Sequence, residues 1–127
     1  MILAIKTDQD PAEIYLLGLD HEIAKQKIWP AERHLARDLL GEIETLVDNN
    51  FEQLSGVIVF RGPGSFTGLR IGVTTANSIA YAQNISIVGA AGDDWLHDGL
   101  AKLSEKQNDK IVMPEYGAPA NITKPRK

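Results

Sequence analysis

Residues 60–70, with the sequence FRGPGSFTGLR, combine glycines, hydroxyls and arginines at a spacing that could bind an anion. Gly62 and Gly64 give the backbone access to positive φ, so that several N–H groups of the loop can point outward. Arg61, Arg70 or Lys6 could act as counter-charges. The candidate anion or nucleotide loop therefore consists of Gly62, Gly64, Ser65, Phe66, Thr67 and Arg70.

The spacing does not match either of two familiar phosphate loops. A Walker A loop continues its last glycine with Lys and then Ser or Thr, whereas Gly68 is followed by Leu69 and Arg70. A dinucleotide fingerprint needs G-x-G-x-x-G, and the glycines here are one residue too far apart. The pattern favours a structural corner between a strand and a helix over an autonomous nucleotide site, and leaves a weak anion site open.

Four small residues, Gly68, Gly72, Ala76 and Ala80, recur at every fourth position after the loop. On a helix this spacing lays one stripe of minimal side chains along a single face. A glycine inside a helix costs about 1 kcal/mol relative to alanine, so Gly72 indicates a neighbouring backbone packed too close for a Cβ. That neighbour is either the chain's own sheet or a helix of another subunit.

Composition sets broad limits on function. The chain has 127 residues, 43% of them hydrophobic, which suits one globular domain. A net charge of −4 argues against a free-standing nucleic-acid binder, although Lys124, Arg126 and Lys127 form a basic cluster. There is no cysteine and no long apolar run. We therefore expect a cytoplasmic protein with no disulfide, no thiol nucleophile and no membrane association.

Periodicity and turn residues predict an alternation of strands and helices. Expected strands cover 2–5, 13–19, 22–29 (an edge strand), 57–60 and 85–88, and expected helices cover 31–49, 68–84 and 93–105. Thr67 is the expected N-cap of the second helix. Residues 1–105 would form one lobe, followed by an extended Pro- and Gly-containing basic tail over 106–127.

The order β-β-β-α-β-α-β-α describes an α/β fold: a mixed five-stranded sheet with helices packed on it, as in ribonuclease H-like and actin-like ATPase (ASKHA) lobes. Enzymes of these folds hold divalent metal with carboxylates at strand ends. Here Lys6 follows the first strand, and 57–60 contain no carboxylate. The sequence therefore predicts neither a catalytic residue nor a metal site, and a nuclease is disfavoured.

Three segments resemble the TsaB (YeaZ) family: Met1 to Ile5, the helix carrying Arg33-His34, and above all the block from Gly62 to Gly72. The resemblance extends to about Ala91. It implies a subunit of the bacterial machinery that places threonylcarbamoyl on adenosine 37 of tRNA. The catalytic relative TsaD carries His-x-x-x-His after the last strand, where this chain has Gly92 and Leu96, so the resemblance implies the non-catalytic member.

By this resemblance the chain is a scaffold that pairs with a TsaD-like transferase through helices, and forms a homodimer when alone. A TsaE-like ATPase is a further candidate partner, a nucleotide at the subunit interface stays open, and tRNA would be contacted only indirectly. No cofactor is otherwise expected. The expected partner-binding residues are Leu35, Leu39, Gly68, Leu69, Gly72, Val73, Ala76 and Ala80.

The C-terminal part departs from the family. Family members carry a second, smaller lobe, for which 102–127 provide too few residues, yet 113–124 resemble the family's closing segment. We expect a shortened form in which Tyr116 anchors the tail. Two alternatives remain open: a nucleotide-binding protein or enzyme that uses the Gly62 to Gly68 loop, and a degenerate paralogue kept as a structural partner.

Overall fold

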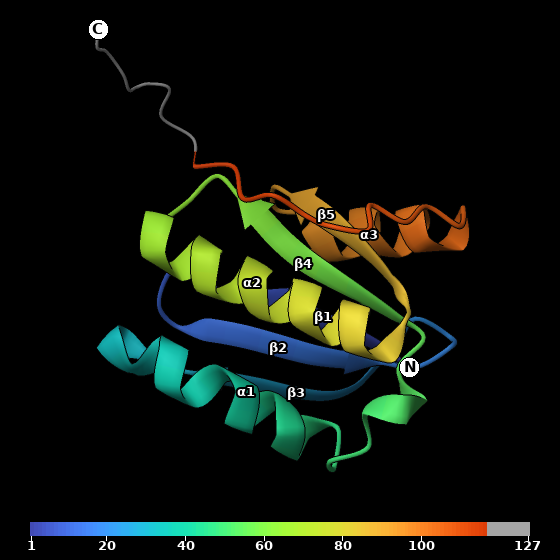
Figure 1. The fold of residues 1–127 in the computed structure, drawn as a ribbon, viewed down its shortest axis with the longest axis horizontal. Helices are drawn as coiled ribbons and strands as arrows, with labels where there is room; N and C mark the ends of the chain where they lie inside the picture. Colours follow the sequence, from blue (N-terminus) through green and yellow to red (C-terminus); the bar gives the residue numbers. More distant parts are fainter. Residues whose placement is uncertain (117–127) are drawn as a thin grey trace, which may run out of the picture.

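A computed structural model describes residues 1–116 of the chain. Figure 1 shows one sheet with helices on it. The strands are β1 (Ile2–Lys6), β2 (Ala12–Leu17), β3 (Ile23–Trp29), β4 (Gly56–Gly62) and β5 (Ser86–Ala91). The α-helices are α1 (Leu35–Leu46), α2 (Phe66–Gln83) and α3 (Trp95–Ser104), and short 3-10 turns cover Glu32–His34 and Phe51–Gln53.

The sheet has the strand order β3-β2-β1-β4-β5. β1 pairs antiparallel with β2 and parallel with β4, so it lies at the centre, and its apolar side chains are buried on both faces. β3 forms one edge, and six of its seven residues are exposed, including the polar run Lys25, Gln26 and Lys27 at its middle. The predicted mixed five-stranded sheet with an edge strand near 22–29 is confirmed.

The helices form two layers, one on each face of the sheet. α1 and α2 lie side by side on one face (Figure 1) and bury a core with the inward side chains of β1, β2, β4 and β5. α3 packs on the other face against β4 and β5, where Trp95 contacts the rings of Tyr15 and Phe60. Because successive side chains along a strand point to opposite faces of the sheet, the strands contribute side chains to both cores.

Element boundaries differ from the prediction at helix starts. α1 begins at Leu35 and not at 31, because Glu32–His34 form a 3-10 turn in which Glu32 has φ of 52°. α2 begins at Phe66, and its N-cap is Ser65, whose Oγ accepts a bond from the Gly68 N–H at 3.5 Å. The expected cap at Thr67 is therefore wrong.

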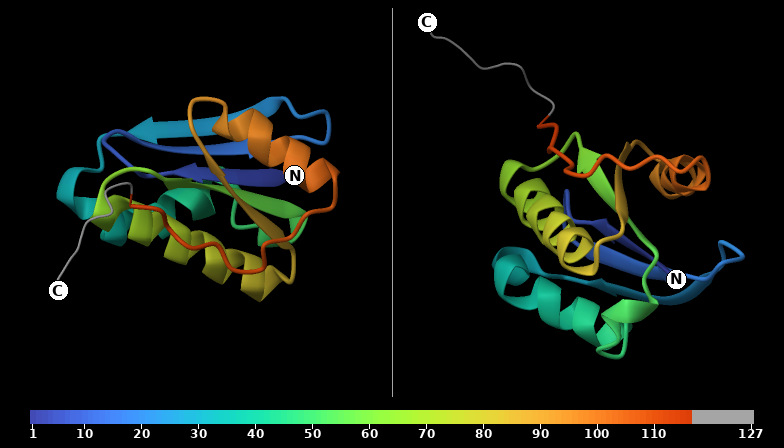
Figure 2. Two further views of the ribbon diagram at one scale, coloured as in Figure 1. Left: turned by 90° about the horizontal axis from the view of Figure 1, so that it is seen from above. Right: turned by 45° about the vertical axis from the view of Figure 1, so that its right-hand side comes forward.

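α3 is followed by residues 105–116, which form neither helix nor strand and run back across the sheet edge (Figure 2). Within residues 1–116, no helix is long and apolar enough to cross a membrane. The basic cluster at Lys124, Arg126 and Lys127 lies outside the described residues.

Candidate functional site

The stripe of small residues on α2 faces the chain's own first strand. A Cβ on Gly68 would collide with the backbone carbonyl of Thr7, and a Cβ on Gly72 would collide with the Thr7 hydroxyl. Thr7 is itself 3% exposed and donates a hydrogen bond to the carbonyl of Gly68 at 2.7 Å. The close neighbour is therefore the residue that directly follows β1, through its backbone at Gly68 but through its side chain, and not the expected backbone, at Gly72. No foreign helix is needed to explain the glycines.

The other residues expected to bind a partner are also buried inside the molecule. Their side chains belong to the two cores, with exposures between 0% and 8%: Leu35, Leu39, Leu69, Val73, Ala76 and Ala80. These side chains therefore do not form the accessible docking surface that was expected, because they pack inside the molecule. Helical period identified the face of each helix that packs on the sheet, and a helix buries that face first against its own sheet.

The opposite, outward face of α1 and α2 carries apolar side chains that remain about half exposed in the structure of residues 1–116. Phe66 is 56% exposed and Leu40 is 49% exposed. A groove of about 360 Å³ runs between the two helices and is lined by Ala36, Phe66, Thr67, Arg70, Ile71, Thr74 and Thr75. Most residues of this groove were not predicted from the sequence as binding residues. The available signal was Phe66 and Leu40, two large apolar residues that lie off the buried stripes of their helices.

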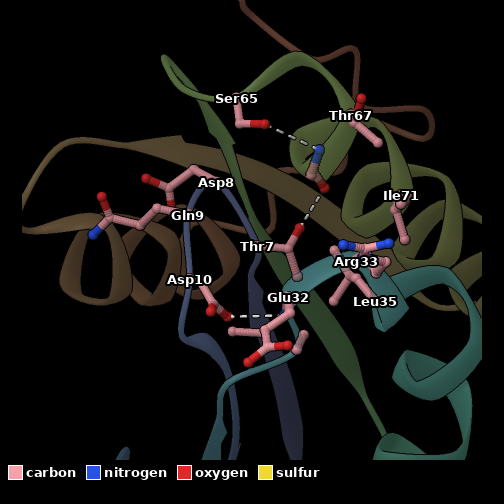
Figure 3. Close-up of a pocket in the computed structure, with 13 residues that line it drawn as sticks. Thr7, Asp8, Gln9, Asp10, Glu32, Arg33, Leu35, Ser65, Thr67 and Ile71 are labelled. Atoms are coloured by element: carbon pink, nitrogen blue, oxygen red, sulfur yellow. Dashed lines mark hydrogen bonds between the residues drawn. The ribbon is translucent and has the colours of Figure 1, made fainter.

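A second hollow lies at the carboxyl end of β1 (Figure 3), and of the candidate anion loop only Ser65 and Thr67 line it. Thr7, Asp8 and Asp10 face Ser65, Thr67 and Gly68 across it, and Glu32, Arg33, Leu35 and Ile71 close one side. The hollow has a volume of about 180 Å³, below the range of about 300–1,000 Å³ that small-molecule sites occupy. Three of the lining side chains are carboxylates and one is a guanidinium, which disfavours a bare anion.

The backbone of the loop packs against other segments of the same chain. The Ser65 N–H donates to the Asp8 carbonyl at 3.1 Å. A Cβ on Gly64 would collide with the Asp8 side chain, and Gly62, with φ of 128°, leaves room for the carbonyl of Glu115. The glycines of the loop thus permit close approach of two other segments of the chain, as a structural corner would require.

The three expected counter-charges do not converge on the loop. Lys6 pairs with Asp8 at 2.7 Å. The Nε of Arg61 donates to the Met113 carbonyl at 3.1 Å, and the guanidinium of Arg70 lies 5.9 Å from the centroid of the Phe66 ring. Lys6 and Arg61 are engaged by other groups, and Arg70 lies beside the Phe66 ring in the groove lining, so the loop lacks the focused positive field that phosphate binding uses.

The described residues contain no cluster of three or more His, Asp or Glu side chains that could hold a metal ion. Lys6 occupies the end of β1, where the related fold classes place a carboxylate, and its ammonium group lies 4.8 Å from the centroid of the Phe60 ring. The same ammonium group forms a salt bridge with Asp8. The end of β1 therefore offers a cation where a metal site would need a carboxylate.

Comparison with known proteins finds a family model and several relatives that are similar to this chain. The family model "TsaD: tRNA N6-adenosine threonylcarbamoyltransferase" matches residues 19–92. Among curated relatives, the tRNA threonylcarbamoyladenosine biosynthesis protein TsaB of Bacillus subtilis (strain 168) is 38% identical over 119 residues. That alignment covers 92% of this chain and 50% of the relative.

The protein of the same description from Escherichia coli (strain K12) is 28% identical over 110 residues, covering 80% of this chain and 47% of the relative. A solved structure described as YeaZ from Pseudomonas aeruginosa superposes with a TM-score of 0.61 at 24% identity, over 71% of this chain and 43% of that one. The structural likeness concerns the fold. The chain spans about half the length of the curated relatives it matches.

Proposed function

Since this chain matches the TsaD family model over more than half of its length and belongs to the TsaB (YeaZ) family, we propose that it is a non-catalytic subunit in the biosynthesis of threonylcarbamoyladenosine in tRNA. Its role is to pair with a TsaD-like transferase and hold that enzyme in its working form. It works in the cytoplasm, and it reaches tRNA only through the assembly, in which a TsaE-like ATPase is a further candidate member.

The observation that carries this proposal is the uncovered groove between α1 and α2. Phe66 lines this groove together with small and polar side chains, including Ala36 and Thr74, and Leu40 is a further exposed apolar residue of α1. Two adjacent helices with an apolar seam can accept two helices of a partner at an interaxial distance of about 8–10 Å. The paired helices thus make contact through the outward face of the pair, while the glycine stripe holds α2 close to the sheet.

In the absence of the transferase, a second copy of this chain can occupy the same groove. Two copies related by a twofold axis would present the same helix pair to each other, which is the symmetry of most soluble homodimers. The homodimer and the heterodimer then compete for one surface. Mixing the chain with a TsaD-like subunit should convert homodimer into heterodimer in a size measurement.

Thr74→Lys tests the docking surface directly. Thr74 is exposed and lines the groove, so a lysine leaves the fold intact and places a long charged side chain where the partner must pack. Ala101→Lys is the matched control, because Ala101 is an exposed helix residue on α3, across the sheet. We expect Thr74→Lys to weaken binding to the TsaD-like subunit at least about tenfold, and Ala101→Lys to leave the affinity unchanged.

Unchanged binding by a folded Thr74→Lys variant would refute the groove as the docking surface. The biological role has its own test: the chain is added to an extract that lacks its own TsaB, and threonylcarbamoyladenosine in tRNA is measured. Restored modification supports a working subunit. Complex formation without restoration would instead identify a degenerate paralogue.

A further inference from the structure

Residues 107–116, which we call the return segment, follow α3 and run along the outer edge of β5 toward the start of α2 (Figure 2). The Asp109 N–H donates to the Ile87 carbonyl at 2.8 Å. The carboxylate of Asp109 accepts from the Gly89 N–H at 2.9 Å, and the side chain of Asn108 accepts from the Ile87 N–H at 3.1 Å. The segment thus satisfies the edge of β5 much as a further strand would.

Asn77 of α2 fastens the middle of the return segment. Its side-chain amide donates to the Val112 carbonyl at 3.0 Å and accepts from the Val112 N–H at 2.9 Å. A carboxamide offers one donor side and one acceptor side, so it pairs with a peptide group on both. Val112 is 3% exposed and belongs to the core under α2. The segment is therefore fixed to the same helix that forms one wall of the docking groove.

The last residues of the return segment are held over the corner that joins β4 to α2. The Glu115 N–H donates to the Arg61 carbonyl at 2.6 Å, and the Arg61 side chain donates back to the Met113 carbonyl. The carbonyl of Glu115 occupies the space that a side chain at Gly62 would fill. These contacts determine where Tyr116 emerges.

Tyr116 lies against Phe66 at the mouth of the docking groove. The two ring centroids are 4.4 Å apart with an angle of 31° between the planes, and Tyr116 remains 37% exposed. Arg70 lies beside Phe66 in the groove lining. Among residues 1–116, no carboxylate forms an ion pair with Arg70. Two partly exposed rings and an available guanidinium are the residue types that dominate protein interfaces.

We propose that Tyr116, positioned by the return segment, is a contact residue for the partner in the assembly proposed above. The occupant is a helix of the TsaD-like subunit that presents an aliphatic side chain to the Tyr116 and Phe66 rings and a carboxylate to Arg70. This inference rests on the proposed function, and it extends the docking surface beyond α1 and α2 to a segment distant in sequence. Asn77 acts as a positioning residue, since it touches the return segment and not the partner.

Tyr116→Ala in the full chain tests the contact, with Ile111→Ala as its control. Ile111 is an apolar residue of the same segment, 68% exposed, and it precedes the Val112 clamp. We expect Tyr116→Ala to weaken binding to the purified TsaD-like subunit about tenfold and Ile111→Ala to change it less than about twofold, at unchanged melting temperature. Tyr116→Phe keeps the stacked ring and should bind like the unmodified chain.

Crosslinking can show that residue 116 touches the partner, and a purely structural role of this residue would produce no crosslink. A photoreactive benzoylphenylalanine at position 116 should crosslink to the TsaD-like subunit, and the same group at position 111 should not. Asn77→Asp loses the donor to Val112 and should weaken binding as Tyr116→Ala does, without adding to it in the double variant. Wild-type affinity of Tyr116→Ala, together with loss of binding by Thr74→Lys, would overturn this inference and leave the proposed function standing.

Discussion

The hydroxyl of Thr7 fills the space that a side chain at Gly72 would need. A Cβ built on Gly72 lies within 3.0 Å of the Thr7 Oγ, closer than real Cβ atoms come to other heavy atoms. Because the same hydroxyl is bonded to the Gly68 carbonyl at 2.7 Å, Thr7 cannot move away without losing a buried hydrogen bond. One threonine thereby accounts for two glycines of α2.

Gly72→Ala should lower the free energy of unfolding by about 1–3 kcal/mol. The new methyl group collides with Thr7, and the cost of this overpacking exceeds the gain in helix propensity. Urea denaturation measures this change. Gly41→Ala is the control: Gly41 lies in α1 with no atom within 4 Å of a built Cβ, so alanine there should stabilise the protein by about 0.5–1 kcal/mol.

The double variant Thr7→Ala/Gly72→Ala separates overpacking from other effects. Thr7→Ala alone removes the hydroxyl and methyl that a Cβ on Gly72 would meet, and it also removes the hydrogen bond to Gly68. If the clash with Thr7 causes the loss of stability, Gly72→Ala should lower the free energy of unfolding less in the Thr7→Ala variant than in the native protein. Additive effects would refute this account of the glycine.

Asn84 ends α2 in the left-handed conformation, with φ of 56°. Asparagine tolerates this region better than most residues, and glycine tolerates it best. Asn84→Ala should therefore lower the free energy of unfolding by about 1 kcal/mol, whereas Asn84→Gly should leave it unchanged or raise it slightly. Thermal melts of the two variants test this explanation. An equal loss of stability in both would show that the side chain of Asn84 has a role beyond its backbone conformation.

Stability should fall in alkaline solution because of Tyr15. Burial raises the pKa of the Tyr15 hydroxyl above its ordinary value of 10.0, and the hydrogen bond to Glu13 and the charge of Glu13 raise this pKa further. The unfolded chain ionises first, so the contribution is complete below pH 10.0 and is lost as the pH rises above it. In Tyr15→Phe, the free energy of unfolding should decline less steeply in that range.

Glu13→Gln checks the cause of this shift. The variant removes the charge beside Tyr15 and keeps an acceptor, so the pKa of Tyr15 should fall relative to the native protein. It should remain above the ordinary value, since burial is the larger cause. Ultraviolet absorbance of the phenolate during an alkaline titration follows the group directly. A return of the pKa to the ordinary value would show that Glu13, and not burial, dominates.

Calorimetric titration of the isolated chain with ATP and Mg²⁺ should give no micromolar binding. The hollow beside the loop is small and lined by Asp8, Asp10 and Glu32, and Lys6 is engaged by Asp8. Micromolar affinity would favour the alternative of a nucleotide-binding protein. A nucleotide that binds only in the presence of the TsaD-like subunit would instead belong to the subunit interface.

The sequence by itself determined the order of the elements, the mixed sheet with β3 at its edge, and the presence of a close neighbour at Gly72. These follow from local patterns: alternation along strands, helical period, and the free-energy cost of glycine in a helix. Two local details were wrong, the N-cap and the first residue of α1, because Ser65 and Thr67 are both competent caps and a 3-10 turn at Glu32–His34 has no distinct pattern.

Only the tertiary structure decided which surface covers the small residues and which remains open. Periodicity identifies a face of a helix, but it cannot say whether the chain's own sheet or a partner lies against that face. Packing of Thr7 on Gly68 and Gly72 settles this for α2. The Tyr116 and Phe66 pair was equally beyond sequence reasoning, since the two residues are brought together by backbone contacts between segments far apart in the chain.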